Sequence, residues 1–289
     1  MPLPRSIALP TDEEIAGMES FCRDDLAACV IGSAESLTSL GIKVVRDPSL
    51  KHLGWASFAI EVDGVRAGIE VSDFPIPDPA SYGFAHWFMF NYTSALVPYR
   101  HLAPFGPCSF SDWSLYDRLR PEINYQSNGI RMLNNQTIIK RVHIDKFDGR
   151  NLRRWRMLEM LSEFGDRVDV ERTGQEAFLR KLNDCLCYVH SPGSWLNQLD
   201  RTPVQVMALG GCVVQPEIHC YLGDIRPRRG IHYLACEDDY SDIPAIIRWC
   251  DVNRDRCREI GAAAKRLFGD QASPSALWSR VRHRLCHAG

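Results

Sequence analysis

The stretch that decides the fold is residues 188–249, which begins YVHSPGSWLNQLDRTPVQVMALGGCVV and ends PAIIRW. A helix is predicted to begin at Thr202-Pro203, since threonine is a good N-cap and proline suits the first helical position. The helix is predicted to end at Gly210-Gly211, because glycine readily takes the left-handed conformation that closes helices. Val213-Val214 then opens a buried strand. This order of apolar strands and helices is typical of an α/β domain with a parallel sheet.

The alternation extends upstream through the second half of the chain. Strands are expected at 137–144, 168–170 and 186–190, with helices at 151–164 and 174–184. The helix at 151–164 is expected to bury a face formed by Leu152, Trp155, Leu158 and Leu161. Because the strands are separated by helices, the sheet is expected to be parallel and covered on both faces.

The first half of the chain is less regular. Asp63-Gly64, between the apolar runs 55–62 and 65–71, predicts a type I′ hairpin. Residues 1–25 are expected to form a leader and a polar helix, and 26–31 and 42–46 short strands. A last amphipathic helix is predicted from Ser273-Pro274 to Cys286. We place the domain boundary near residue 130, giving domains 1–130 and 131–289, with the last helix a candidate for crossing back to the first domain.

Composition sets limits on what the protein can be. The 289 residues are enough for two domains, and the charged content of 24% is that of an ordinary globular protein. The net charge of −2 argues mildly against a nucleic-acid partner, although it leaves a local basic patch open. We find no apolar run long enough for a transmembrane segment and no signal-peptide core, so a cytoplasmic location is expected. The eleven cysteines show no paired CxxC spacing, which predicts reduced, buried thiols rather than a zinc site.

Arginines gather where the second domain should bind a ligand. Ligands of open α/β sheets bind beyond the carboxyl ends of the strands. Arg141, Arg150, Arg153, Arg154 and Arg156 lie within sixteen residues, and the arginine fork suits diphosphate oxygens. Arg154 and Arg156 are expected on a solvated helix face. For Arg150 and Arg153, near a helix start, phosphate binding and a solvated face are equally open.

The turn at Ser191-Pro-Gly193-Ser194 would allow a ligand close to the backbone, although a plain turn explains Gly193 as well. Arg201 at a helix N-terminus is electrostatically unfavourable by itself, because the helix dipole already places positive charge there. A bound phosphate would relieve this repulsion. We therefore interpret Arg201 as a binding residue.

Carboxylates suggest two further sites. The acid-rich turn 237–242 could hold a metal, but a helix start capped by Ser241 or Asp242 explains it better. Asp73 follows the second hairpin strand and could act as a general base, although an aspartate before Pro75 is also an ordinary turn residue. His86, His101 and Asp112 are reserve candidates. The chain lacks GxGxxG, GxxxxGK[ST] and GxSxG, which disfavours simple dinucleotide oxidoreductases, P-loop enzymes and α/β-hydrolases.

Several passages resemble a known family. Residues 189–193, 200–203 and 207–214 are similar to the nucleotide-binding domain of GT-B glycosyltransferases, with Gln205 where many members carry a ribose-binding glutamate. A narrower resemblance is to the capsule-associated and protein O-glucosyltransferase family. It is carried by Asp73-Phe-Pro75, by the basic passage 140–156, and by 231–234 followed by 239–243, Trp249 and 259–261.

The resemblance implies an α/β, GT-B-like fold of two Rossmann-like domains with a reduced N-terminal domain. Residues 1–130 would be the acceptor side and 131–289 the nucleotide-sugar-binding domain. It implies a metal-independent, inverting hexosyl- or pentosyltransferase that moves a sugar from a UDP-sugar or related donor to an acceptor hydroxyl, with no cofactor. The acceptor is left open among a glycan, a small molecule and a protein.

In this scheme Asp73 is the catalytic base. The donor would be bound by Arg141, Arg150, Arg153, Gly193, Ser194, Arg201, His232, Tyr233 and Asp242. Two other functions stay open at this point. One is a metal-dependent transferase that uses the 237–242 turn, and the other is a non-catalytic nucleotide- or sugar-binding module. Sensitivity to EDTA tests the first, and turnover of the donor tests the second.

Overall fold

The structure is a computed structural model. It describes residues 1–18, 27–72, 74–106, 110, 113–127, 131–133, 149–171, 173–193, 197–223 and 225–287. The chain forms two compact units. Unit 1 comprises Met1–Ser114, His219–Arg226 and Asp270–Gly289, and unit 2 comprises Leu115–Ile218 and Pro227–Gly269. The domain boundary expected near residue 130 stays a prediction.

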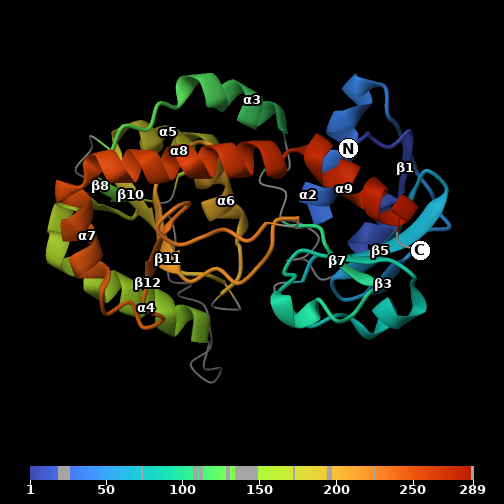
Figure 1. Ribbon diagram of the computed structural model, residues 1–289, viewed down its shortest axis with the longest axis horizontal. Coiled ribbons are helices and arrows are strands. Elements are labelled where there is room, and N and C mark those ends of the chain that lie inside the picture. Colours follow the sequence, from blue (N-terminus) through green and yellow to red (C-terminus); the bar gives the residue numbers. More distant parts are fainter. Residues whose placement is uncertain are drawn as a thin grey trace. The chain divides into compact units, whose positions relative to one another are not determined.

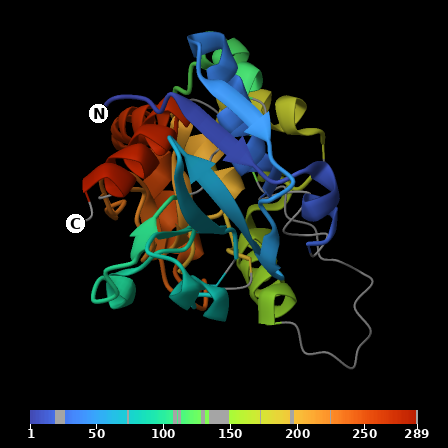
Figure 2. The ribbon, with the colours of Figure 1, turned by 90° about the vertical axis from the view of Figure 1, so that its right-hand side faces the viewer.

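Unit 1 is built on a mixed sheet, whose strands face the viewer in Figure 2. The described residues give it seven strands in the order β2-β1-β4-β5-β6-β7, with β3 paired to β4. The pairs β1–β2, β5–β6 and β6–β7 are parallel, whereas β4 is antiparallel to β1, β3 and β5. The strands are β1 (Ser6–Leu9), β2 (Lys43–Arg46), β3 (His52–Gly54), β4 (Ser57–Val62), β5 (Val65–Glu70), β6 (Trp87–Met89) and β7 (Leu102–Pro104).

The predicted hairpin joins β4 to β5. Asp63 and Gly64 have φ values of 50° and 82°, as both central residues of a type I′ turn require. The Asp63 carboxylate accepts the backbone N–H groups of Arg5 and Ser6 at 2.7 and 3.0 Å and pairs with Arg282 at 2.8 Å. The turn therefore also fastens the start of β1 and the last helix to the sheet.

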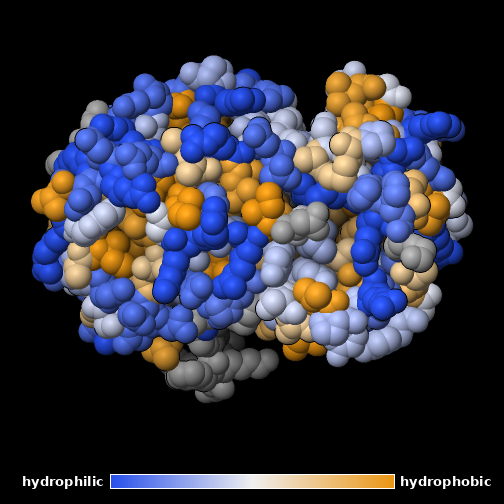
Figure 3. Space-filling model, viewed as in Figure 1, coloured by the Kyte–Doolittle hydropathy of each residue, from blue (hydrophilic) through white to orange (hydrophobic). Residues whose placement is uncertain are grey.

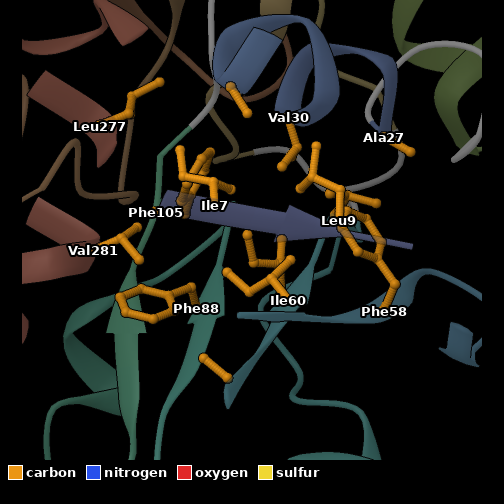
Figure 4. Packing of buried hydrophobic residues seen from close by; sticks show 14 of the residues in the cluster. Ile7, Leu9, Ala27, Val30, Phe58, Ile60, Phe88, Phe105, Leu277 and Val281 are labelled. Carbon is orange, nitrogen blue, oxygen red and sulfur yellow. The ribbon is translucent and has the colours of Figure 1, made fainter. Parts of the chain in front are cut away.

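Two helices cover one face of this sheet, α2 (Ala28–Ser36) and α9 (Pro274–His287). Figure 4 shows Val30 of α2 and Val281 of α9 directed at Ile7, Ile60 and other strand residues. Trp278 is fully buried and its indole N–H donates to Ser33 Oγ at 3.0 Å, which links α9 to α2. The remaining helical elements of unit 1 are short: α1 (Asp12–Ala16), η2 (Leu37–Leu40), η3 (Pro79–Gly83) and η4 (Ser94–Leu96).

Two expectations for the N-terminal region are wrong. The apolar run at 26–31 is helical in its described part, because Cys29, Val30, Ser33 and Ala34 recur with helical spacing and bury one face of α2. Residues 6–9, expected within a leader, form β1, which lies between β2 and β4. This four-residue strand has too little length to show a pattern, and its pairing with both β2 and β4 stabilises it.

Unit 2 is a parallel five-stranded sheet, in the described residues, with the order β12-β11-β10-β8-β9. Figure 1 shows its strands between α8 above and α4 below. The strands are β8 (Arg131–Leu133), β9 (Val168–Asp169), β10 (Cys185–Val189), β11 (Val213–Pro216) and β12 (Leu234–Cys236). The helices are α3 (Trp113–Glu122, entering from unit 1), α4 (Gly149–Leu161), η5 (Ser162–Arg167), α5 (Gln175–Arg180), η6 (Lys181–Asp184), α6 (Arg201–Ala208), α7 (Ile243–Val252) and α8 (Arg254–Gln271, which continues into unit 1).

The predicted order of strands and helices in residues 188–249 is confirmed. All five residues of β10 are buried, as expected of a central parallel strand covered on both faces. Gly210 has a φ of 94° just past the end of α6. The expected strand at 137–144 lies outside the described residues. In α4 the expected apolar face is wrong, because Leu152 and Trp155 are exposed while Met157 and Leu161 are buried.

The nine described cysteines are free thiols, and all but Cys286 are buried. On the face shown in Figure 3, apolar residues form small groups among polar ones, as on most folded-protein surfaces. Within the described part of the chain, every helix falls short of the length or the apolar character needed to cross a membrane.

Candidate functional site

The topology of unit 2 places a site at the carboxyl end of β10. The chain proceeds from β8 outward to β9, then returns to the other side of β8 and continues through β10, β11 and β12. The direction of winding therefore reverses between β8 and β10. In open parallel sheets, ligands bind at this point, beyond the carboxyl ends of the strands. The loop that follows β10, residues 190–193, lies there.

A chain of hydrogen bonds fixes this loop. Tyr188 Oη lies 3.0 Å from His190 Nδ1, and His190 Nε2 lies 2.7 Å from Asp200 Oδ2. The same carboxylate oxygen accepts the backbone N–H of Gly193 at 2.9 Å, and Oδ1 accepts the side-chain amide of Gln198. A neutral imidazole with its proton on Nε2 satisfies these contacts, since it donates to the carboxylate and accepts the Tyr188 hydroxyl. The Gly193 turn is thus held by an anchored aspartate.

Asp200 is also the N-cap residue of α6, yet its side chain makes no capping hydrogen bond. The carboxylate is committed to His190, Gly193 and Gln198 instead. The first turn of α6 consequently has no capping hydrogen bond from its own N-cap side chain, and a positive helix end of this kind favours an anionic ligand. Arg201 is the first residue of the helix and is partly buried.

Arg153 approaches the same loop from α4. Its Nη2 donates to the Gly193 carbonyl oxygen, while its Nε is buried and has no hydrogen-bond partner among the described residues. None of the described carboxylates pairs with this guanidinium. Arg156, one turn further along α4, is instead exposed and paired with Glu159 at 3.1 Å. Arg153 therefore places a positive charge beside the Gly193 turn.

The loop after β12 closes the other side of the cluster. Tyr240 is fully buried with a φ of 62°, and its hydroxyl donates to Ser191 Oγ at 3.0 Å. Burial raises the pKa of the Tyr240 hydroxyl, so it remains a proton donor at neutral pH. Three elements, α4 and the loops after β10 and β12, are thereby joined around residues 190–193.

The acid-rich turn has structural contacts. Asp242 Oδ1 accepts the backbone N–H of Glu237 at 2.9 Å, and Asp239 Oδ1 accepts that of Ser241 at 3.0 Å. The Ser241 contacts lower the pKa of the Asp239 carboxyl. A search of the described residues finds no group of three or more histidines, cysteines or carboxylates able to hold a metal ion.

The structure does not bring all the predicted donor-binding residues together. Arg153, Gly193 and Arg201 lie around the 190–193 loop, and Asp242 follows β12 at the same edge of the sheet. His232 and Tyr233 precede β12 and so lie toward its amino end. His232 Nδ1 accepts the N–H of Arg228 at 3.0 Å, and burial lowers its pKa, as do the nearby Arg228 and Arg266. The buried Tyr233 hydroxyl accepts the N–H of Ile218 at 2.9 Å.

Other predicted residues are not described in full. Arg141, Ser194 and Asp73 lie outside the described residues, and Arg150 is placed in the first turn of α4 without its side chain. Next to Asp73, Ser72 accepts the amide of Asn91 through its carbonyl oxygen at 2.9 Å and the N–H of Phe74 through its Oγ at 3.0 Å. Both neighbours of the predicted base are therefore tied in place.

Sequence reasoning missed a buried carboxylate three residues before Asp73. Glu70, at the end of β5, is 3% exposed, and its Oε2 accepts the N–H of Asp78 at 2.9 Å and the indole N–H of Trp87 at 3.0 Å. Burial, opposed by these two hydrogen bonds and reinforced by the charge of Asp78, raises the Glu70 pKa to about 7. The signal was a glutamate inside the apolar run Ile69-Glu70-Val71. His190 and Asp200, which flank the Gly193 turn, were missed because their contact is not local.

Comparisons with known proteins are limited to solved structures. No family model matches the chain, and no curated protein matches it. Anabaena Alr3699/HepE in complex with UDP aligns with a TM-score of 0.50 and 11% identity over 72% of this chain and 65% of that one. The same protein in complex with UDP and glucose aligns at 0.47, with 12% identity over 72% and 64% of the two chains. A glycosyltransferase from Rickettsia africae aligns at 0.49, with 9% identity over 91% and 81%.

The chain therefore spans a little under two thirds of the length of HepE. At this identity the likeness concerns the fold. The α/β class expected from the sequence is confirmed: the chain is a mixed α/β protein with largely parallel sheets, and it shares its fold with HepE.

Proposed function

We propose that this chain is a glycosyltransferase that moves a sugar from a nucleoside-diphosphate sugar to an acceptor hydroxyl. The observation that carries the proposal is the Arg153 guanidinium, which lies beside the Gly193 turn and whose buried Nε has no hydrogen-bond partner in the part of the chain that the structure describes. A buried, unsatisfied charged donor is costly, and a diphosphate oxygen would satisfy it. The UDP-bound crystal structure of HepE, which shares the fold, supports UDP as the nucleotide.

The roles follow from the placement of the residues in unit 2. Arg153, Arg201 and the first turn of α6 bind the diphosphate and neutralise the charge that develops on it as it departs. Arg141 and Arg150 precede or begin α4 and would extend the same basic surface. The His190–Asp200 pair holds the Gly193 turn open to the phosphates. Ser194, which follows Gly193 in the sequence, is proposed as a further donor-binding residue, and Asp242 would lie near the nucleoside.

The chemical step follows the resemblance to the O-glucosyltransferase family and a GT-B-like mechanism. The acceptor oxygen attacks the anomeric carbon, the bond from that carbon to the diphosphate oxygen breaks, and the acceptor proton passes to Asp73. Attack opposite to the leaving group inverts the anomeric centre. Transfer of a hexose or pentose by this route is metal-independent, because arginines supply the positive charge that a metal ion would otherwise provide.

Donor turnover tests the proposal. The purified chain is incubated with a panel of nucleotide sugars, and release of the nucleoside diphosphate is measured with and without EDTA. We expect release from a UDP-sugar that EDTA leaves unchanged. Loss of release in EDTA would favour a metal-dependent transferase. Binding of the donor without any release, across a panel of glycan, small-molecule and protein acceptors, would favour a non-catalytic binding module.

A further inference from the structure

Unit 1 contains a cavity of about 450 Å³ that the proposed transfer chemistry does not use. Its volume lies in the range of small-molecule sites, roughly 300–1,000 Å³. The cavity is lined by residues of β6 and β7, by the segments around Tyr92 and Tyr221, and by three basic residues of α9. The basic residues are Arg280, His283 and Arg284. All of these residues belong to unit 1.

The described residues that line the cavity include Arg280 and Arg284 and no aspartate or glutamate. These two arginines are one helical turn apart on α9. The Arg280 guanidinium also donates to the side-chain oxygen and the carbonyl oxygen of Gln271, at 3.2 and 2.8 Å. Arg284 Nη2 donates to the Arg100 carbonyl oxygen at 2.6 Å, but its Nε is buried and has no hydrogen-bond partner among the described residues. Burial lowers the pKa of His86, and the charge of Arg284 lowers it further.

The other walls are aromatic and apolar. The rings of Tyr92 and Tyr221 meet edge to face, with centroids 6.2 Å apart, and Leu102 and Val97 continue the surface. The backbone N–H of Tyr221 donates to the Tyr92 carbonyl oxygen at 2.9 Å, and Thr93 forms a bridge with Cys220. Backbone hydrogen bonds therefore join the two segments that carry these tyrosines.

The basic and aromatic walls together fit a ligand that is partly anionic and partly apolar. A purely apolar ligand would leave the Arg284 Nε unsatisfied in a drier environment, which is unfavourable. A cation would be repelled by α9. An inorganic anion would satisfy the Arg284 Nε but leave the tyrosine walls without contacts. A ring that carries an anionic group and hydroxyls meets all three demands.

We propose that this cavity binds a sugar bearing an anionic group, with the anion at Arg284 and Arg280 and the sugar ring against Tyr92 and Tyr221. The anionic group is a carboxylate or a phosphate, because both accept the paired N–H donors of arginine. The proposal stands on unit 1 alone and does not require that unit 2 bind UDP.

Isothermal titration of the full chain with glucuronate, glucose 6-phosphate, glucose and inorganic phosphate tests it. At least one of the two anionic sugars is expected to bind at least about tenfold more tightly than both glucose and phosphate. This factor corresponds to the free energy of one hydrogen bond to a charged group. Selective binding of glucuronate identifies a sugar acid, and selective binding of glucose 6-phosphate identifies a sugar phosphate. Binding of none of the four compounds, or equal binding of glucose, would overturn the proposal.

Variants locate the binding in the cavity. Arg284→Gln is expected to lower the affinity for the anionic sugar at least about tenfold. Arg66→Gln, which removes the same charge from the exposed part of β5, is expected to leave binding unchanged. Tyr221→Leu removes an aromatic wall without changing the charge. It is expected to lower the affinity for the sugar but to leave the preference of the cavity for an anionic sugar unchanged. Unchanged affinity in both Arg284→Gln and Tyr221→Leu would exclude this cavity. Arg153→Gln, which disables the proposed UDP site, should leave the affinity for the sugar intact.

Discussion

Glu70 offers a sharp test of the electrostatics of unit 1, because its carboxyl is 3% exposed and its pKa is raised to about 7 by burial. In the unfolded chain the value is near the ordinary 4.5. A carboxyl whose pKa is raised by folding favours the folded state most below pH 4.5, where it is protonated in both states. That contribution falls as the pH rises from 4.5 to 7 and is fully lost above pH 7.

The magnitude follows from the two pKa values of about 7 and 4.5. Each pKa unit corresponds to about 1.4 kcal/mol, so the free energy of unfolding loses about 3 kcal/mol across this range. Glu70→Gln removes the ionisation and keeps a carbonyl oxygen that can accept from Asp78 and Trp87. The variant is therefore expected to be more stable than the wild type above pH 7 by up to this amount, and to lose its advantage near pH 4.5.

The assay is urea unfolding of both proteins between pH 5 and pH 9, followed by circular dichroism. Glu61→Gln on the neighbouring strand, where the side chain is only partly buried, serves as the control for a change of charge. The difference between wild type and Glu70→Gln should widen with pH, whereas the Glu61→Gln difference should not follow the same course. A constant difference between wild type and Glu70→Gln at every pH would refute the argument.

Three further substitutions test the proposed site and the packing behind it. Asp73→Asn should abolish sugar transfer and leave UDP affinity unchanged; full transfer activity would remove Asp73 from the role of base. Asp200→Asn should lower stability by about 1–3 kcal/mol and weaken UDP, because the donors of the Gly193 turn lose their anionic acceptor; an unchanged melting temperature and affinity would contradict this. Gly261→Ala should destabilise the protein by about 1–3 kcal/mol, since its Cβ would lie 2.1 Å from the Gly210 carbonyl oxygen. Gly269→Ala in the same helix is the comparison, since its Cβ would meet a side-chain atom, the Tyr116 hydroxyl at 2.8 Å, rather than backbone. Equal thermal stability of these two variants would show that the backbone contact is relaxed.

Local signals predicted much of the fold. Asp63-Gly64 and Gly210 take the positive φ values that their residue types indicated. The α/β alternation of 188–249 was readable because proline and glycine mark helix ends. The predicted N-cap Thr202 was wrong, since α6 begins at Arg201 with Asp200 as its N-cap residue. The short strand β1 was not readable, since partners distant in the sequence stabilise it. The strand predicted at 26–31 was wrong for a related reason, because a short apolar run fits a strand and a helix equally well.

The candidate site was predictable in part. The arginine-rich passage and the glycine turn indicated an anion site at the carboxyl ends of the strands, and the structure places Arg153 against Gly193. The contact between His190 and Asp200 depends on how the 190–193 loop folds back onto the start of α6, which no spacing rule gives. His232 and Tyr233 were chosen by resemblance. Their side chains accept backbone N–H groups of unit 2, a buried one of Ile218 and an exposed one of Arg228.

The measurement that tests the central claim most directly is isothermal titration of UDP into wild type, Arg153→Gln and Arg156→Gln. The two arginines share a helix, but Arg153 contacts the Gly193 turn whereas Arg156 is exposed and paired with Glu159. We expect wild type and Arg156→Gln to bind UDP equally, and Arg153→Gln to bind it at least about tenfold more weakly. No binding of UDP or any other nucleoside diphosphate to the wild type, or equal binding by all three proteins, would contradict the account.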